Sequence, residues 1–244
     1  ILGKKIISVE RRAKNILIYL SGDTVLLIHQ KMTGHLLVGK WHIADERGQK
    51  RGLTRTKERI IPLFPPAVVE DPYNRFIHLI LTLNDGRMLA LSDVRKFAKV
   101  ILGTREQIEK LPELTLLGPD ALDPNLPLGQ FVGIVLVEKR RIKQVLMDPN
   151  VIAGIGNIYS DDILWQARVH PEVRASRLTQ SQLHAIYKAM RAVLAKAVRL
   201  RGTSTSDFRD TAGLPGGYTG HLLVYQQKGK PCKRCKTLIE RIIV

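Results

Sequence analysis

The sequence predicts an α+β multidomain protein whose first half is an antiparallel β-sandwich and whose second half is helical. Short apolar segments separated by turn residues recur through the first 115 residues, which is typical of antiparallel sandwiches and barrels. A stretch rich in proline, glycine and aspartate, residues 116–124, then interrupts this pattern. From Leu126 onward the apolar residues recur at helical spacing, so we expect a domain boundary near residue 116.

The predicted strands are short and are joined by recognisable turns. Residues 21–23 (Ser-Gly-Asp) predict one hairpin turn, and residues 84–86 (Asn-Asp-Gly) predict another. Residues 41–74 are charged and contain prolines, so we expect a long surface loop there. Strands are predicted at residues 1–10, 16–20, 25–29, 36–38, 76–83, 87–91 and 222–225.

The helices are predicted from capping residues and from apolar periodicity. Thr104, followed three residues later by Gln107, forms a capping-box pattern. Thr179 stands as a cap in front of a long amphipathic run. Helices are predicted at residues 104–111, 131–137, 138–147 and 179–201, with another that begins near residue 157.

The stretch 142–171 carries the first functional signal. Residues 148–150 (Asp-Pro-Asn) end one helix, and Gly154 and Gly156 permit a tight turn. Asn157 then stands where the N-cap of the next helix is expected. A glycine-lined turn before a helix presents N–H groups and a positive dipole end, which suits a phosphate. An ordinary helix–turn–helix packing unit with an asparagine cap explains the same pattern equally well.

The charge of the chain points to a polyanionic partner. Its 244 residues include 39 Lys and Arg against 22 Asp and Glu, and the pI is about 10.1. Nucleic acid is the first candidate, and a membrane surface is the second. The sequence shows no apolar span for a bilayer and no signal-peptide pattern, so no membrane association is expected. Two cysteines exclude a disulfide framework and favour a reducing, cytoplasmic location.

Two predicted loops combine cationic and apolar side chains. Arg95, Lys96 and Phe97 occur together at a loop tip, which suits phosphate contacts and base stacking. Met32 is an apolar side chain in a polar loop. The alternatives are that Phe97 is a core residue flanked by solvated charges, and that Lys14 is a solvated lysine between two strands.

The two cysteines form a single C-x-x-C motif in a basic segment. Cys232 and Cys235 supply half of a tetrahedral zinc site, which needs four ligands when it is structural. The nearest histidine, His221, precedes the motif across a predicted strand. A redox dithiol or two unrelated thiols are the alternatives.

Taken together, these motifs resemble the bacterial formamidopyrimidine-DNA glycosylase family, bifunctional glycosylase and AP lyase enzymes that remove 8-oxoguanine and ring-opened purines. The endonuclease-VIII-like enzymes, which favour oxidised pyrimidines, share the plan, but VERRAK and SDVRKF look more like the purine branch. The resemblance rests on VERRAK (9–14), IHQKMTGHL (28–36), SDVRKF (92–97), LLGPD (116–120), LMDPNVIAGIGNIYSDDIL (146–164), ARVHP (167–171) and VYQQKGKPCKRC (224–235).

The resemblance implies three structural parts and a DNA partner. Residues 1–115 match the β-sandwich lobe, residues 116–215 match a helix–two-turn–helix DNA-binding lobe, and residues 216–244 match the lesion loop with part of a zinc-finger hairpin. The implied partner is double-stranded DNA that contains oxidised purines or abasic sites. A monomer in the bacterial cytoplasm, associated with the nucleoid, is expected.

The resemblance also assigns roles to single residues. Lys14 matches a lysine that faces the sugar–phosphate of the lesion and assists catalysis. Three positions match side chains that fill the gap left by the flipped nucleotide, two match phosphate contacts, and two match the loop that closes over the extruded base. In that order the DNA-binding positions are Met32, Arg95 and Phe97, then Asn157 and Lys143, then Gly217 and Tyr218.

The chain departs from the family pattern at three places. The family's nucleophile, an amino-terminal proline, and its neighbouring glutamate acid/base precede the segment that begins at Ile1, so the chain as written is expected to be inactive. One structural zinc is implied, with only Cys232 and Cys235 of its ligands in the chain. Asp162 stands where the family has glutamate. A non-catalytic paralogue that binds damaged DNA, or a basic RNA- or ribosome-associated protein, are the other interpretations.

Overall fold

The computed structural model describes residues 1–50 and 53–244, with the side chains of 45–50 and 53–58 left aside. The chain divides into two compact units. The first contains residues 1–27, 101–200 and 220–244, and the second contains residues 28–100 and 201–219. A segment of the first half and most of the second half therefore belong to the same unit.

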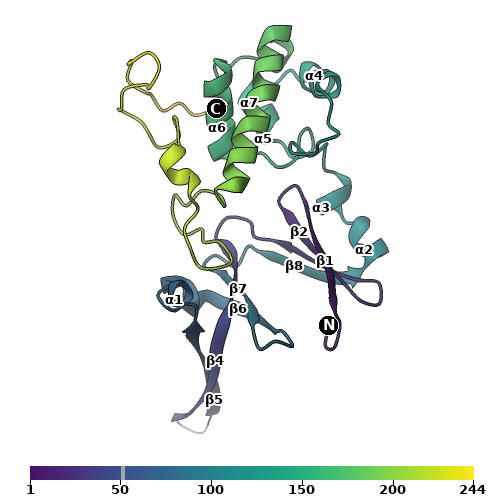
Figure 1. The fold of residues 1–244 in the computed structure, drawn as a ribbon, viewed down its shortest axis with the longest axis vertical. Coiled ribbons are helices and arrows are strands. Elements are labelled where there is room, and N and C mark those ends of the chain that lie inside the picture. The colour runs from purple at the N-terminus through teal and green to yellow at the C-terminus, as the bar shows by residue number, and fades with distance from the viewer. Residues whose placement is uncertain (51–52) are drawn as a thin grey trace. The chain divides into compact units, whose positions relative to one another are not determined.

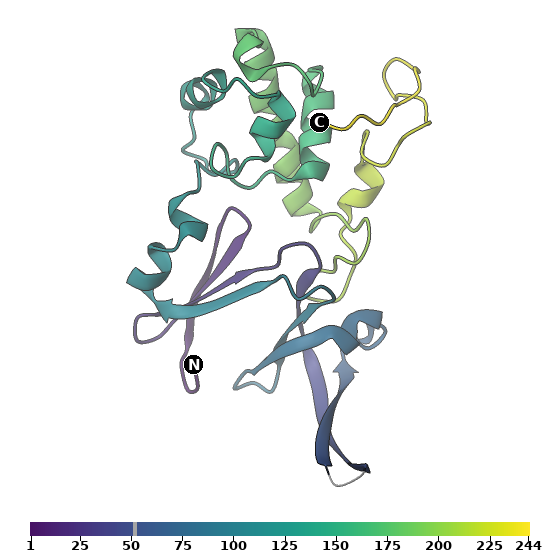
Figure 2. The same cartoon turned by 180° about the vertical axis from the view of Figure 1, so that it is seen from behind.

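The first unit holds most of a four-stranded sheet with the order β1-β2-β3-β8 (Figure 2). Its buried core packs Leu17, Val25 and Leu27 against Ile108 of the following helix. The turn predicted at residues 21–23 joins β2 to β3, but β1 begins later than expected. The strands are β1 (Ile6–Arg12), β2 (Asn15–Leu20), β3 (Thr24–His29) and β8 (Lys99–Thr104).

The second unit contains another four-stranded sheet, with the order β5-β4-β7-β6. Its core gathers Leu37, Trp41, Val68, Ile77 and Ala90. β4 pairs antiparallel with β5 on one side and with β7 on the other, and β6 completes the sheet. The elements are β4 (Gly34–Lys50), β5 (Leu53–Phe64), α1 (Pro66–Val69), η1 (Pro72–Phe76), β6 (Ile77–Thr82) and β7 (Met88–Asp93).

The long surface loop predicted at residues 41–74 is wrong. Most of this stretch forms the paired strands β4 and β5, drawn as the long hairpin in Figure 1. Strand pairing satisfies backbone groups whatever the charge of the side chains, so a charged composition does not exclude a hairpin. Trp41 and Asn74, at the two limits of the stretch, are joined by a 2.9 Å hydrogen bond from the indole Nε1 to the amide Oδ1.

The helices follow the apolar periodicity, and the longest two pack side by side (Figure 1). The predicted capping box of Thr104 with Gln107 and the predicted cap at Thr179 are both present, and Gln182 completes a capping box with Thr179. α7 buries one stripe that includes Leu183, and it exposes Lys188 and Arg199. The helices are α2 (Arg105–Glu109), α3 (Pro112–Thr115), α4 (Leu128–Leu136), α5 (Ile142–Met147), α6 (Asn157–Ala167), η2 (Ala175–Arg177), α7 (Gln180–Arg199) and η3 (Tyr218–His221).

Three local predictions in the second half are corrected. Gly156, with φ −124° and ψ 177°, is the N-cap of α6, and Asn157 is the first helical residue. Residues 138–141 are not helical, and residues 222–225 are not a strand. Within the described residues, the apolar run at 222–225 has no strand to pair with, and a strand does not form without a partner.

Candidate nucleic-acid interface

Lys14 and the start of α6 come together in the first unit. The Lys14 Nζ donates a 2.9 Å hydrogen bond to the carbonyl oxygen of Ile155, in the turn that precedes α6. A Cβ at position 156 would lie 3.2 Å from that Nζ, so a glycine at this position leaves room for the ammonium group. Asn157, the next residue, is exposed. The lysine and the exposed asparagine therefore border the same helix start.

The ammonium of Lys14 is partly desolvated although the residue as a whole is exposed. The protein atoms around it lower the pKa of Lys14 from its ordinary value, because burial disfavours the charged form. Its hydrogen bond is to a carbonyl, which leaves its positive charge available to an incoming anion. The arrangement suits a phosphate, since the N–H groups at the start of an 11-residue helix add a positive dipole end.

Lys143 occupies the same part of the unit but has an ionic partner. Its Nζ lies 2.7 Å from the Oδ1 of Asp161, and the two side chains are 15% and 22% exposed. Lys143 is on α5 and Asp161 is on α6, so the ion pair links the two helices on either side of the glycine turn. A phosphate that binds Lys143 must share this lysine with a protein carboxylate.

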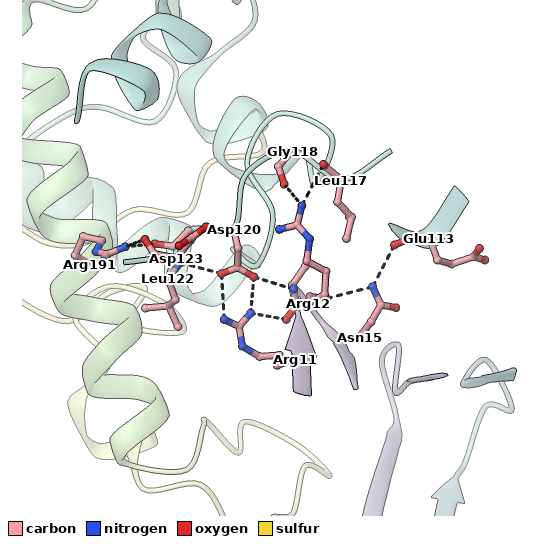
Figure 3. Close-up of polar contacts among 12 residues, drawn as sticks. Arg11, Arg12, Asn15, Glu113, Leu117, Gly118, Asp120, Leu122, Asp123 and Arg191 are labelled. Atoms are coloured by element: carbon pink, nitrogen blue, oxygen red, sulfur yellow. Dashed lines mark hydrogen bonds and ion pairs between the residues drawn. The ribbon is translucent and has the colours of Figure 1, made fainter. Parts of the chain in front are cut away.

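Asp120 fastens the turn that carries Lys14, and Figure 3 shows its contacts. Its carboxylate accepts hydrogen bonds from Arg11 at 2.6 and 3.1 Å, from the backbone N–H of Ala13 at 2.8 Å and from that of Leu122 at 2.9 Å. Ala13 has φ +56°, an unfavourable value for a residue with a Cβ. The carboxylate thereby holds the backbone immediately before Lys14 in a strained turn.

The segment around Asp120 is also bonded to the turn before α6. The N–H of Ala121 donates to the carbonyl of Ala153, and the N–H of Ala153 donates to that of Pro119, both at 2.9 Å. A Cβ at Gly118 would meet the Val151 carbonyl oxygen, so this close approach requires glycine. Asp120 thus connects the two turns that place Lys14 and Asn157. Sequence reasoning used LLGPD as a boundary and as a family motif but missed this role, because Arg11 and Ala13 are more than 100 residues away from Asp120.

Burial and hydrogen bonding shift the pKa of Asp120 in opposite directions. Burial alone would raise its pKa, but the hydrogen bonds from Arg11, Leu122 and Ala13 outweigh it and hold the pKa of Asp120 below its ordinary value. The carboxylate is therefore ionised at neutral pH and accepts all four bonds at full strength.

The second unit brings Met32, Arg95 and Phe97 together at the ends of two loops. The Arg95 guanidinium lies 4.6 Å from the centre of the Phe97 ring, and its Nη1 lies 3.2 Å from the Met32 sulfur. Met32 is 71% exposed and Phe97 is 52% exposed. Phe97 is therefore not a core residue. Two exposed apolar side chains around one guanidinium form a surface that water does not favour and that a nucleobase can stack on.

The loop that carries Gly217 and Tyr218 is closed at its base. Thr203 and Gly217 form an antiparallel bridge, and the N–H of Tyr218 donates to the carbonyl of Gly202 at 2.9 Å. Gly217 is exposed, whereas Tyr218 is only 2% exposed. Of the two predicted DNA-binding residues, Gly217 is accessible to a ligand, and Tyr218 belongs to the packing of the loop.

The C-x-x-C segment is attached to α6. Cys232 is buried, Cys235 is exposed and both thiols are free. The backbone N–H groups of Cys235 and Arg234 point at the Cys232 sulfur and lower the pKa of Cys232 to about 6. Arg234 donates to the carbonyl of Trp165 at 3.1 Å and lies 4.0 Å from the centre of its ring. Asp162, fully buried, accepts from the N–H of Leu223 at 3.0 Å.

The two thiols fit half of a structural zinc site. The two N–H contacts at the Cys232 sulfur suit a thiolate ligand, but a tetrahedral site needs four ligands. Within residues 1–50 and 53–244, no group of three or more His, Cys, Asp or Glu residues is placed to hold a metal ion. The same described residues contain no helix that is both long enough and apolar enough to cross a bilayer.

The fold and these sites define a basic α+β protein that binds nucleic acid. The family model described as the formamidopyrimidine-DNA glycosylase N-terminal domain matches residues 1–100. The model described as the formamidopyrimidine-DNA glycosylase H2TH domain matches residues 117–209. The chain belongs to the formamidopyrimidine-DNA glycosylase family, and it is a member of a family of enzymes.

Relatives and solved structures agree with this assignment. The chain is 38% identical over 250 residues to formamidopyrimidine-DNA glycosylase from Chloroflexus aggregans, which covers 100% of this chain and 78% of the relative. The MutM (Fpg) structure from Thermus thermophilus covers 99% of this chain and 79% of its own, with 31% identity and a TM-score of 0.80. The match to the Lactococcus lactis Fpg complex with abasic-site DNA covers 99% of this chain and 78% of the Lactococcus chain, with 26% identity and a TM-score of 0.78.

Proposed function

We propose that this chain is the DNA-binding body of a base-excision repair glycosylase with AP lyase activity that acts on oxidised purines in double-stranded DNA. The observation that carries the proposal is the exposed group of Met32, Arg95 and Phe97 around one guanidinium. A flipped nucleotide leaves a gap in the base stack, and stacking groups that enter it offset part of the unstacking cost. Arg95 supplies hydrogen-bond donors for the base left without a partner.

The first unit supplies the phosphate contacts in this proposal. Asn157 and the N–H groups of α6 bind the backbone of the damaged strand, and Lys143 binds a neighbouring phosphate. Lys14, desolvated and hydrogen-bonded beside the helix start, faces the sugar–phosphate at the lesion and assists base removal. Gly217 belongs to the loop that closes over the extruded base, with Tyr218 holding the loop's base.

A helix–two-turn–helix arrangement for the DNA-binding part, zinc as a structural cofactor and residence with the nucleoid belong to the same proposal. The turn between α5 and α6, bounded by Asp148 and Gly156, supports the first. The N–H groups aimed at Cys232 support the second, with Cys232 and Cys235 as two of the four ligands. The net charge of +17 at pH 7 supports the third.

The test compares binding of the chain to two duplexes that differ at a single position. One carries a tetrahydrofuran abasic analogue opposite cytosine, and the other is intact. We expect fluorescence anisotropy to give a dissociation constant at least about tenfold lower for the abasic duplex. Equal constants would overturn the proposal and would favour a general RNA- or DNA-binding protein. Competition by duplexes with 8-oxoguanine or an oxidised pyrimidine then separates the purine from the pyrimidine branch.

Replacing Asn157 by alanine is expected to weaken binding by about tenfold on every DNA sequence alike. A hydrogen bond to a charged group contributes about 1.5–3 kcal/mol, and a phosphate contact carries no sequence information. The measurement is anisotropy on several unrelated abasic duplexes. Asn125→Ala, at another exposed asparagine, is the matched control and should have no effect. An effect that depends on sequence would contradict a phosphate contact.

Substitutions of Lys143 and of Asp161 are expected to have opposite effects on salt-dependent DNA binding. Lys143→Ala should reduce the slope of log K against log salt concentration by up to about 0.9, the value for one phosphate. Asp161→Asn removes the competing carboxylate of the 2.7 Å ion pair, so it should tighten binding several-fold at low salt. Binding titrations between 50 and 300 mM salt, taken as roughly the useful range, measure both. A parallel loss of affinity in both variants would show that the ion pair itself matters.

A further inference from the structure

One buried carboxylate joins the two loops that carry Met32, Arg95 and Phe97. Asp93, at the end of β7, is 2% exposed. Its Oδ1 accepts from the Thr33 hydroxyl at 2.5 Å and from the N–H of Arg95 at 3.2 Å, and its Oδ2 accepts from the N–H of Ala98 at 2.7 Å. The hydroxyl belongs to the loop before β4, and the two amides belong to the loop after β7. All three donors are in the same unit as Asp93.

The backbone around Asp93 brings the two loops close together. Gly34, the first residue of β4, pairs with Asp93, the last residue of β7, so the loop before β4 ends where the loop after β7 begins. A Cβ at Gly34 would lie 2.5 Å from the Gln30 carbonyl oxygen and 3.1 Å from the Ala98 Cβ. Lys31 and Lys96 both have positive φ, at +55° and +56°, which bends each loop tightly beside an exposed side chain.

Asp93 remains an ionised acceptor although it is buried. Burial alone would raise its pKa, but the hydrogen bonds from Thr33, Ala98, Arg95 and Phe97 outweigh it, so the pKa of Asp93 lies below its ordinary value. Hydrogen bonds to a carboxylate are shorter and stronger than those between neutral groups. The Thr33 hydroxyl therefore links the two loops, because it donates to Asp93 and also accepts from the N–H of Arg95 at 3.2 Å.

We propose that Asp93, through Thr33 and the N–H of Arg95, is a positioning residue that holds Met32, Arg95 and Phe97 as one pre-ordered unit for insertion into the gap left by a flipped nucleotide. This inference rests on the proposed function. Ordering flexible side chains during binding costs conformational entropy, and a site that is already ordered avoids that cost. Thr33 and Asp93 touch no DNA in this scheme, and their effect is carried by the three exposed side chains.

The experiment measures insertion directly, with 2-aminopurine placed beside the abasic analogue as a fluorescent reporter of unstacking. Thr33→Val removes the hydroxyl with little change in shape, and Thr33→Ser restores it. We expect Thr33→Val to slow the stopped-flow fluorescence rise about tenfold and to lower the preference for abasic over intact duplex about tenfold. Thr33→Ser should behave like the unsubstituted chain. Thr115→Val, which removes a hydroxyl that donates to the carbonyl of Leu111 at the start of α3, is the matched control.

The outcomes separate this inference from the proposed function. If the unsubstituted chain shows no preference for the abasic duplex, the proposed function fails, and this inference fails with it. If that preference is present but Thr33→Val leaves both the preference and the insertion rate unchanged, only the positioning role of Asp93 is overturned. Equal weakening on abasic and intact duplex by Thr33→Val would also overturn it, because a general loss of structure does not discriminate between them. Asp93→Asn should also slow insertion and lower the preference for the abasic duplex, and, in contrast to Thr33→Ser, it should not behave like the unsubstituted chain.

Discussion

Replacing Asp120 by alanine is expected to lower the free energy of unfolding by about 2–4 kcal/mol. The substitution leaves the N–H groups of Ala13 and Leu122 without their acceptor, and each unsatisfied buried group costs about 1–3 kcal/mol. The ion pair with Arg11 adds little, because the Arg11 side chain is 45% exposed and water screens it. Urea unfolding monitored by circular dichroism measures the change.

Asp123→Ala is the matched control for Asp120. Its carboxylate caps a local turn through the N–H of Asn125, so its removal should cost well under half as much. Because the folded-state pKa of Asp120 is depressed, its contribution is fully present above the unfolded pKa of about 3.9 and is lost as pH falls below it. The stability difference between the unsubstituted chain and Asp120→Ala should shrink below that pH. A difference that stays constant with pH would contradict the charged role of Asp120.

Replacing Phe97 by alanine is expected to reduce the preference for an abasic-site duplex by about 5- to 150-fold. Stacking of a base on an aromatic side chain contributes about 1–3 kcal/mol, and Phe97 exposes half of its side chain beside Arg95. Affinity for intact duplex should change little, since no gap is open there. Anisotropy titrations on the abasic and intact duplexes give the ratio.

Phe64→Ala is the matched control for Phe97, because Phe64 is 58% exposed in the same unit but lies at the end of β5. It should leave the preference unchanged. Met32→Ala should act in the same direction as Phe97→Ala. If Phe97→Ala weakens binding to both duplexes equally, the ring contributes to general affinity, and the gap-filling role is wrong.

Local sequence signals predicted the local structure well. The capping box at Thr104, the cap at Thr179 and the hairpin turn at residues 21–23 are present, because each depends on neighbours within a few residues. The hairpin of β4 and β5 was missed, since its pairing satisfies the backbone regardless of side-chain charge. Asn157 was predicted to be the N-cap of α6 but is its first helical residue, because Gly156 already adopts the extended conformation of the cap.

The candidate site was predictable only in its exposed members. Met32, Arg95 and Phe97 were found from their residue types and from the family resemblance, and the structure brings them together. Asp93 and Asp120 were not found, although SDVRKF and LLGPD contain them. Their partners, such as Thr33 and Arg11, are about 60 and 109 residues away in sequence. A carboxylate that organises remote turns leaves no periodic signal in the chain.

The contacts of Asp162 and Trp165 make α6 a shared support. This helix spans about 16 Å at 1.5 Å per residue, and Asn157 begins it. Asp162 in its middle holds the backbone of Leu223, and Trp165 in its last turn holds Arg234 of the C-x-x-C segment. The same helix therefore supports both the proposed phosphate contact at Asn157 and the C-x-x-C segment, so a substitution that displaces α6 is expected to disturb both.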